Sequence, residues 1–96
     1  MKFEWDENKN QINKKKHGIS FEEASSVFFD EEAILKPDPD HSEVEDRFLL
    51  LGLSADVKVL VVVHCYRGEN ETIRIISARK ANKREVQDYV SQYREE

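Results

Sequence analysis

Hydrophobic residues are densest in the second half of the chain, where they form three runs separated by short polar stretches. The runs span residues 47–54, 57–66 and 71–77, and β-branched residues dominate the last two. Such runs, bounded by Ala55-Asp56 and by Gly-Glu-Asn at 68–70, are typical of strands joined by tight turns. The pattern therefore predicts a meander of antiparallel strands at the centre of a sheet.

The N-terminal residues predict a short edge strand followed by a helix. Residues 2–5 alternate between apolar and charged side chains, as expected for a strand. Asp6 is a suitable N-cap for a helix over 8–16, and Gly18 is a suitable residue just beyond its C-terminal end. Ile12 makes up nearly all of the apolar face of this helix, so we expect little hydrophobic burial from it.

Two further helices carry both a capping signal and an apolar face. Ser20 and Glu23 have the spacing of a capping box at the start of the second helix, which we expect to reach residue 29. Asn82 and Glu85 have the same spacing at the start of the last helix. The apolar faces consist of Phe21, Ala24, Val27 and Phe28 in the second helix and of Val86, Tyr89, Val90 and Tyr93 in the last.

Length and composition indicate a single α+β domain over residues 1–96, with a further short strand expected at 33–36. No apolar run is long enough to span a membrane, and the N-terminus does not have the pattern of a secretory signal. Cys65 is the only cysteine, so no intramolecular disulfide can form and we expect a cytoplasmic location. We interpret Cys65 as a small buried hydrophobic residue.

The net charge of −5 is unevenly distributed along the chain. Residues 22–46 contain ten acidic residues and one basic residue, Lys36, so the other segments together carry a net charge of +4. An acidic segment therefore masks a mildly basic remainder, and the overall charge does not exclude a polyanionic partner such as RNA. The acidic segment itself is suited to a basic partner protein.

The polar loop from Pro37 to Asp46 gathers several potential metal ligands. Their spacing matches no ordered ligand pattern, such as the loop of an EF-hand or two histidines on one helix face. We therefore expect a solvated loop, and neither a metal nor another cofactor. The alternative ligand set is Asp38, Asp40, His41 and Glu43.

The predicted strand registers place ionisable side chains next to one another. If Ala55-Asp56 is a two-residue turn, Arg47 pairs with His64. If residues 68–70 form a three-residue turn, His64 pairs with Arg74, and Tyr66 lies beside them. These groups repel one another unless an anion lies among them, so the row predicts an anion site. The opposite face is expected to lie under helices and consists of Phe48, Leu50, Val57, Val59, Val61, Val63, Ile73 and Ile75.

This prediction depends on the register. A one-residue shift in the second turn would move Arg74 to the opposite face, and Arg79 joins the row only if the strand bends near Ser77. An alternative is that the arginines form ordinary surface salt bridges. Their partners would then be Glu43, Glu45 or Asp46.

Motifs distributed over nearly the whole chain resemble the BrnT family of bacterial toxins. They are Phe3-Glu4-Trp5-Asp6, Lys16-His17-Gly18-Ile19-Ser20-Phe21-Glu22-Glu23-Ala24, Asp38-Pro39-Asp40-His41-Ser42-Glu43, Arg47-Phe48, Val62-Val63-His64 and Ile73-Arg74-Ile75-Ile76-Ser77-Ala78-Arg79-Lys80-Ala81. The resemblance implies a RelE-like fold, in which a small, mostly antiparallel sheet carries two N-terminal helices and a C-terminal helix. It also implies a ribonuclease toxin of a type II toxin–antitoxin pair, neutralised by a ribbon-helix-helix antitoxin (BrnA).

By position, the resemblance implies a basic and polar site. Its members are Arg47, His64, Arg74, Ser77 and Arg79, with Lys16 and His17 as further candidates. The charge at the end of the first helix, where Lys16 and His17 lie, is suited either to binding phosphate or to complementing the helix dipole.

The leading hypothesis is metal-independent cleavage of messenger RNA, on or off the ribosome, by attack of a ribose 2′-OH on the adjacent phosphorus. In this hypothesis His64 is the base or acid. Arg47, Arg74 and Arg79 stabilise the phosphate, and Lys16, His17, Tyr66 and Ser77 bind the substrate. One alternative is a weak or inactive toxin that pairs with the antitoxin and represses its operon, so that it meets DNA only through the antitoxin. A metal-dependent phosphodiesterase is another.

Overall fold

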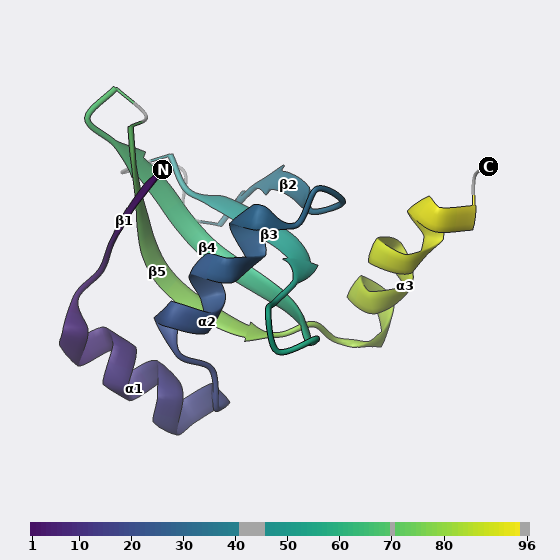
Figure 1. The fold of residues 1–96 in the computed structure, drawn as a ribbon, viewed down its shortest axis with the longest axis horizontal. Coiled ribbons are helices and arrows are strands. Elements are labelled where there is room, and N and C mark those ends of the chain that lie inside the picture. The colour runs from purple at the N-terminus through teal and green to yellow at the C-terminus, as the bar shows by residue number, and fades with distance from the viewer. Residues whose placement is uncertain (41–45, 70, 95–96) are drawn as a thin grey trace.

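The computed structural model describes residues 1–40, 46–69 and 71–94. It confirms an α+β fold with two N-terminal helices, a C-terminal helix and a mostly antiparallel sheet (Figure 1). The elements are β1 (Lys2–Glu4), α1 (Glu7–His17), α2 (Phe21–Ser26), the 3-10 turn η1 (Val27–Phe29), β2 (Ile34–Pro37), β3 (Phe48–Leu53), β4 (Val59–Arg67), β5 (Thr72–Lys80), α3 (Lys83–Ser91) and the 3-10 turn η2 (Gln92–Arg94).

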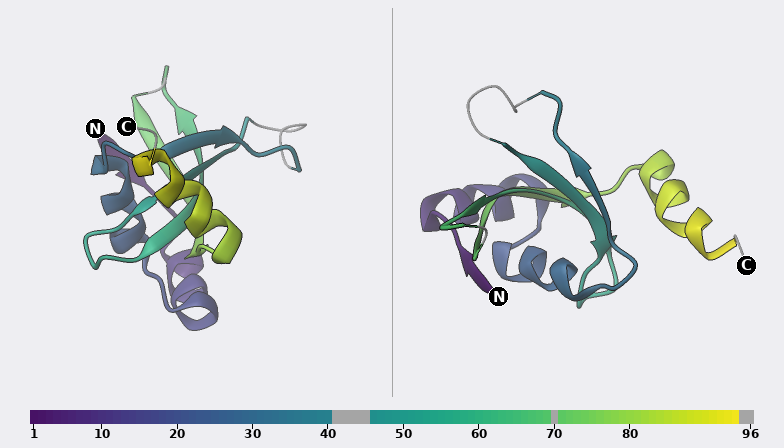
Figure 2. Two further views of the ribbon diagram at one scale, coloured as in Figure 1. Left: turned by 90° about the vertical axis from the view of Figure 1, so that its right-hand side faces the viewer. Right: turned by 90° about the horizontal axis from the view of Figure 1, so that it is seen from above.

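The five strands of the described residues form one sheet in the order β1-β5-β4-β3-β2. β1 pairs with β5 in parallel, and every other pairing is antiparallel. The sheet curves over α2, whereas α3 is set apart at the far end of β5 (Figure 2). In the described part of the chain, no helix is long and apolar enough to cross a membrane.

The predicted helix caps are confirmed, whereas the second helix is α-helical only to Ser26 and continues to Phe29 as the 3-10 turn η1. The Asp6 side chain accepts hydrogen bonds from the first turn of α1, and Gly18 ends that helix with a left-handed φ of 72°. Asn82 and Glu85 form a reciprocal capping box at the start of α3. Ser20 caps α2 by accepting a hydrogen bond from the Glu23 amide.

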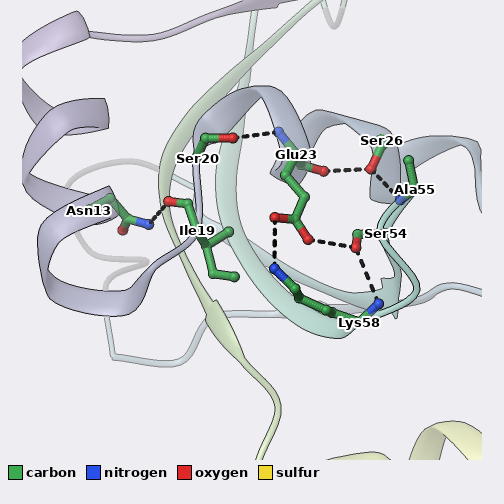
Figure 3. Close-up of polar contacts among 8 residues, drawn as sticks. All are labelled: Asn13, Ile19, Ser20, Glu23, Ser26, Ser54, Ala55 and Lys58. Atoms are coloured by element: carbon green, nitrogen blue, oxygen red, sulfur yellow. Dashed lines mark hydrogen bonds and ion pairs between the residues drawn. The ribbon is translucent and has the colours of Figure 1, made fainter.

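The capping box predicted from Ser20 and Glu23 is not completed by the Glu23 side chain. It accepts a hydrogen bond from the Ser54 hydroxyl at 2.8 Å and lies 3.4 Å from Lys58 Nζ (Figure 3). The Ser26 hydroxyl accepts a hydrogen bond from the Ala55 amide in the same region. These contacts tie α2 to the turn between β3 and β4.

Helix α1 is held by two buried asparagines and not by an apolar face. Ile12 is exposed, whereas Asn10 and Asn13 are buried. Asn10 Oδ1 accepts a hydrogen bond from the Phe21 amide at 2.8 Å. Asn13 Nδ2 donates to the carbonyls of Ile19 and Ala78, and Asn13 Oδ1 accepts from the Ala78 amide. The helix is therefore anchored by hydrogen bonds that hydrophobic periodicity does not reveal.

The main hydrophobic core lies between the sheet and the α2–η1 segment. Gly52 on β3 permits this close approach, because a Cβ atom there would lie 2.9 Å from both Ala33 Cβ and Val27 Cγ1. A substitution at Gly52 would therefore force η1 away from the sheet. The buried core residues are Ile19, Phe21, Ala24, Val27, Leu50, Leu60, Val62, Ile73, Ile75 and Ala78.

Both predicted hairpin registers are wrong by one residue. Phe48, and not Arg47, pairs with His64, because three residues and not two separate the hydrogen-bonded pair Ser54 and Lys58. The third of these connecting residues, Val57, has a left-handed φ of 63°, which is an unfavourable conformation for a β-branched residue. In the second hairpin His64 pairs with Ile75. The predicted row of Arg47, His64 and Arg74 is therefore not formed, because a one-residue shift turns a side chain to the other face.

β5 contains the irregularity that sequence analysis required near Ser77. His64 pairs with Ile75 and Val63 pairs with Ser77, so Ile76 has no partner on β4. Such a bulge inserts one residue into the strand and resets the alternation of the residues that follow. Ser77 and Arg79 consequently lie on the same face as Arg74.

We predict that Asn13→Ala lowers the free energy of unfolding by about 3 kcal/mol, because it leaves buried backbone groups of Ile19 and Ala78 without their partner. Asn8→Ala is the matched control, since Asn8 is an exposed asparagine of the same helix. It should change stability by less than about 0.5 kcal/mol. Urea denaturation measures both, and equal losses in the two variants would contradict the role of Asn13.

Candidate active site on the open face of the sheet

The face of the sheet opposite α2, here called the open face, carries the three predicted arginines, Arg47, Arg74 and Arg79. One end of it is covered by Tyr89 of α3, which packs against Leu51 and Val61. Beyond that end, Leu49 and Val63 are only half-buried. The open face thus presents a partly apolar surface, with charged groups along β5 and on the strands beside it.

A row of four residues crosses this face, one residue away from the predicted row. Cys65 pairs with Arg74, which pairs with Glu4 on β1. Arg47 directly precedes β3, and the alternation of Leu49 and Leu51 places it on the same face, next to Cys65. Cys65 thus occupies the position predicted for His64. It is buried, as sequence analysis expected.

Glu4 lies between two arginines at the β1 end of the row. Its Oε2 atom accepts a hydrogen bond from Nη1 of Arg74 at 2.8 Å and lies 3.6 Å from Nε of Arg67. All three side chains remain accessible: Glu4 is 41% exposed, Arg74 31% and Arg67 53%. A guanidinium has five N–H donors, so the contact with Glu4 leaves Arg74 with donors for an anion.

Arg79 forms a separate, bidentate ion pair with Glu85 of α3. Its Nη1 and Nη2 atoms donate to the two carboxylate oxygens at 2.8 and 2.9 Å. These hydrogen bonds lower the pKa of Glu85 and raise that of Arg79. Ser77 lies between Arg74 and Arg79 on the same face and is half-buried. Ordinary ion pairing is therefore present for Arg74 and Arg79, with Glu4 and Glu85 as partners. Of the predicted partners, Glu43 and Glu45 lie outside the described residues.

His64 lies on the opposite, helix-covered face and is 0% exposed. Its ring stacks edge-on against Phe28, with centroids 4.7 Å apart. Nδ1 lies 3.2 Å from the Val62 carbonyl oxygen, and Nε2 lies 3.2 Å from the Tyr66 hydroxyl. Because a carbonyl only accepts, Nδ1 carries the proton and Nε2 accepts from Tyr66. The prediction that His64 stands among the arginines is wrong, and the cause is the register of both hairpins.

Burial determines the ionisation of this histidine–tyrosine pair. Desolvation lowers the pKa of His64, although the hydrogen bond to Val62 acts in the opposite direction. Desolvation also raises the pKa of Tyr66. The pair is therefore neutral near pH 7.

The remaining predicted residues lie outside the row. Lys16 and His17 form the end of α1, and Tyr66 shares the helix-covered face with His64. The alternative metal set lies partly outside the described residues, because His41 and Glu43 fall in the segment 41–45.

Sequence analysis missed three members of the charged arrangement: Glu4, Arg67 and Glu85. Glu4 reaches Arg74 only because β1 pairs in parallel with β5, a contact between residues far apart in the sequence. Glu85 was assigned to a helix cap alone. In the structure Glu85 both caps the helix and pairs with Arg79, since its Oε1 atom accepts from the Asn82 amide and from Arg79 Nη1.

We predict that the chain loses stability as the pH falls from about 6.5 to 5. Above about 6.5, the pKa of unperturbed histidine, His64 is neutral in both states. Below it, the unfolded chain binds a proton that buried His64 resists, so the free energy of unfolding falls. His64→Phe, which keeps an aromatic ring in the cluster, should reduce this fall.

Urea denaturation at several pH values measures the effect. His17→Gln is the control, because His17 lies in the last turn of α1 outside the aromatic cluster, and it should retain the fall. An unchanged pH dependence in His64→Phe would show that another group causes it.

Comparison with known proteins identifies the family of this chain. The sequence model of the family described as "Ribonuclease toxin, BrnT, of type II toxin-antitoxin system" matches residues 5–85. The crystal structure of the Brucella abortus ribonuclease toxin BrnT is similar, with a TM-score of 0.64 and 28% sequence identity, covering 86% of this chain and 99% of that one. A comparison with curated protein sequences gave no match. The chain thus belongs to the BrnT family of ribonuclease toxins of type II toxin–antitoxin systems.

Proposed function

We propose that this chain is a metal-independent endoribonuclease that cleaves messenger RNA on its open face and thereby inhibits translation. The observation that carries the proposal is the bulge at Ile76, which places Arg74, Ser77 and Arg79 on one face of β5. Bulges are frequent next to active sites, where they redirect side chains. Membership of a ribonuclease toxin family supplies the substrate class.

The arginines are suited to phosphate binding and to stabilising the added charge of a phosphorane. In this proposal Arg74 and Arg47, on either side of Cys65, bind the phosphate that is attacked. Arg74 pairs with Cys65 and Arg79 with Val61, four positions apart on β4, which is about 13 Å at about 3.3 Å per residue. Arg79 therefore binds a different phosphate. Ser77 contributes a hydroxyl between them.

The buried His64 supports this site from beneath and does not touch RNA. Its Nε2 atom holds the Tyr66 hydroxyl, and its ring fills the space between Phe28 and Phe48. Lys16 and His17, at the end of α1, are candidates for contact with a more distant part of the RNA backbone.

We also propose a ribbon-helix-helix antitoxin as the cognate partner, with DNA contacted only through it. The half-buried Leu49 and Val63 beside the arginines support a protein that covers the open face. Covering this face would neutralise the toxin by excluding RNA. The acidic segment 22–46 is suited to a basic region of the same partner.

A second candidate function is that of a weak or inactive toxin that serves as the antitoxin's binding partner. The observation that favours it is that Arg74 and Arg79 are both engaged by carboxylates in the free chain. Intact RNA in the presence of free protein, together with tight antitoxin binding, is the expected result of that function.

We predict that the purified chain cleaves RNA in the presence of EDTA, leaves 2′,3′-cyclic phosphate ends and does not cleave DNA, which lacks the 2′-OH. Arg74→Ala should lower the cleavage rate by about 10²- to 10³-fold, as expected for loss of one donor to the transition state. Arg84→Ala is the control and should retain activity, because Arg84 is an exposed arginine in the first turn of α3.

The assay is run on plain RNA and on translating ribosomes, with product ends identified by their chemistry. A requirement for a divalent metal would contradict the mechanism. Absence of cleavage in both settings would favour the binding partner, and cleavage only on ribosomes would retain the nuclease while restricting its substrate.

A further inference from the structure

Once His64 is placed under the helices, no proton acceptor has yet been assigned among the described residues of the proposed site. Attack by a ribose 2′-OH requires a group that removes its proton, within hydrogen-bond reach of the oxygen. Arginine is unsuited to this task, because its guanidinium stays protonated in proteins. Along the row of Arg47, Cys65, Arg74 and Glu4, Cys65 is only 4% exposed, whereas Glu4 is 41% exposed.

Glu4 also has the position that the chemistry requires. Its Oε2 atom lies 2.8 Å from Nη1 of Arg74, the arginine to which the attacked phosphate is assigned. A phosphate that binds the other N–H groups of Arg74 therefore brings its adjacent 2′-OH next to this carboxylate. Nε of Arg67 lies 3.6 Å from the same oxygen and helps to fix the carboxylate.

We propose that Glu4 is the general base of the ribonuclease reaction, an inference that rests on the proposed function. The Glu4 carboxylate takes the proton of the 2′-OH while the 2′-oxygen forms a bond to phosphorus. The bond from phosphorus to the 5′-oxygen then breaks, and that oxygen takes a proton from a water molecule. Glu4 returns its proton to the resulting hydroxide. The products are a 2′,3′-cyclic phosphate and a 5′-hydroxyl, with no oxidant or reductant involved.

The competing role for Glu4 is to neutralise Arg67 and Arg74. The two roles make opposite predictions for Glu4→Gln, which keeps the size of the side chain and a hydrogen-bond acceptor but removes the charge. If Glu4 only neutralises, this variant binds RNA more tightly and turns it over as fast as the wild type. If Glu4 is the base, the variant binds RNA as well or better but loses turnover.

The test compares kcat and KM at one neutral pH for the wild type, Glu4→Gln and Glu71→Gln, on RNA and in EDTA. We expect kcat of Glu4→Gln to fall about 10²- to 10⁴-fold, the range for loss of a general base, without a rise in KM. Glu71→Gln makes the same change in net charge one residue before β5, at an exposed position, and should keep the wild-type kcat.

The outcomes separate the two proposals. If the wild type cleaves RNA and Glu4→Gln keeps its kcat, the assignment of Glu4 is overturned and the proposed function stands. If the wild type cleaves neither plain RNA nor RNA on translating ribosomes, the proposed function and the assignment of Glu4 are both overturned. Thermal melting verifies folding of the variants. Should Glu4→Gln fail to fold, Glu4→Asp decides, because it keeps the charge but shortens the side chain that carries the base. A wild-type kcat in Glu4→Asp would overturn the assignment of Glu4.

Discussion

The arrangement of the open face depends on the hydrogen bonds that Asn13 makes to the backbone of Ala78. β1 pairs only with Thr72–Arg74, so another group must satisfy the outer edge of β5 beyond that point. Asn13 does so by accepting from the Ala78 amide at 3.1 Å and donating to its carbonyl at 2.8 Å, as a neighbouring strand would. Ala78 follows the bulge by two residues, so this clamp fixes the register of the part of β5 that carries Ser77 and Arg79.

That register determines which charges can act together. In a regular strand Arg74 and Arg79 would point to opposite faces, and Arg79 would be driven into the core. The extra residue at Ile76 avoids this, and each arginine is then oriented by a carboxylate from another element, Glu4 or Glu85. Such pairs add little stability at a surface, but they hold a long side chain in one orientation before substrate arrives.

The sequence predicts well what is encoded locally and poorly what depends on register. The helix caps at Asp6, Ser20 and Asn82 involve residues a few positions apart, and the structure confirms all three. The row across the sheet depended on turn lengths, and the left-handed conformation of Val57 is one that its side chain disfavours. A register error of one residue placed His64 in the row, where the structure has Cys65. Pairing between β1 and β5 joins positions about seventy residues apart, so the contact of Glu4 with Arg74 left no local signal.

The exchange of His64 for Cys65 also changes how the charge of the chain bears on RNA cleavage. A histidine in the row would have added a third basic group and left the acids of the chain as an obstacle to a polyanion. Instead the histidine is a neutral part of an aromatic cluster, and the row ends in a carboxylate next to Arg74. An acidic residue there weakens the attraction for phosphate, yet it supplies the basic atom that the arginines lack. The negative charge at this site is therefore a functional element of the proposed chemistry. It is compatible with phosphate binding because the guanidinium of Arg74 has five N–H donors.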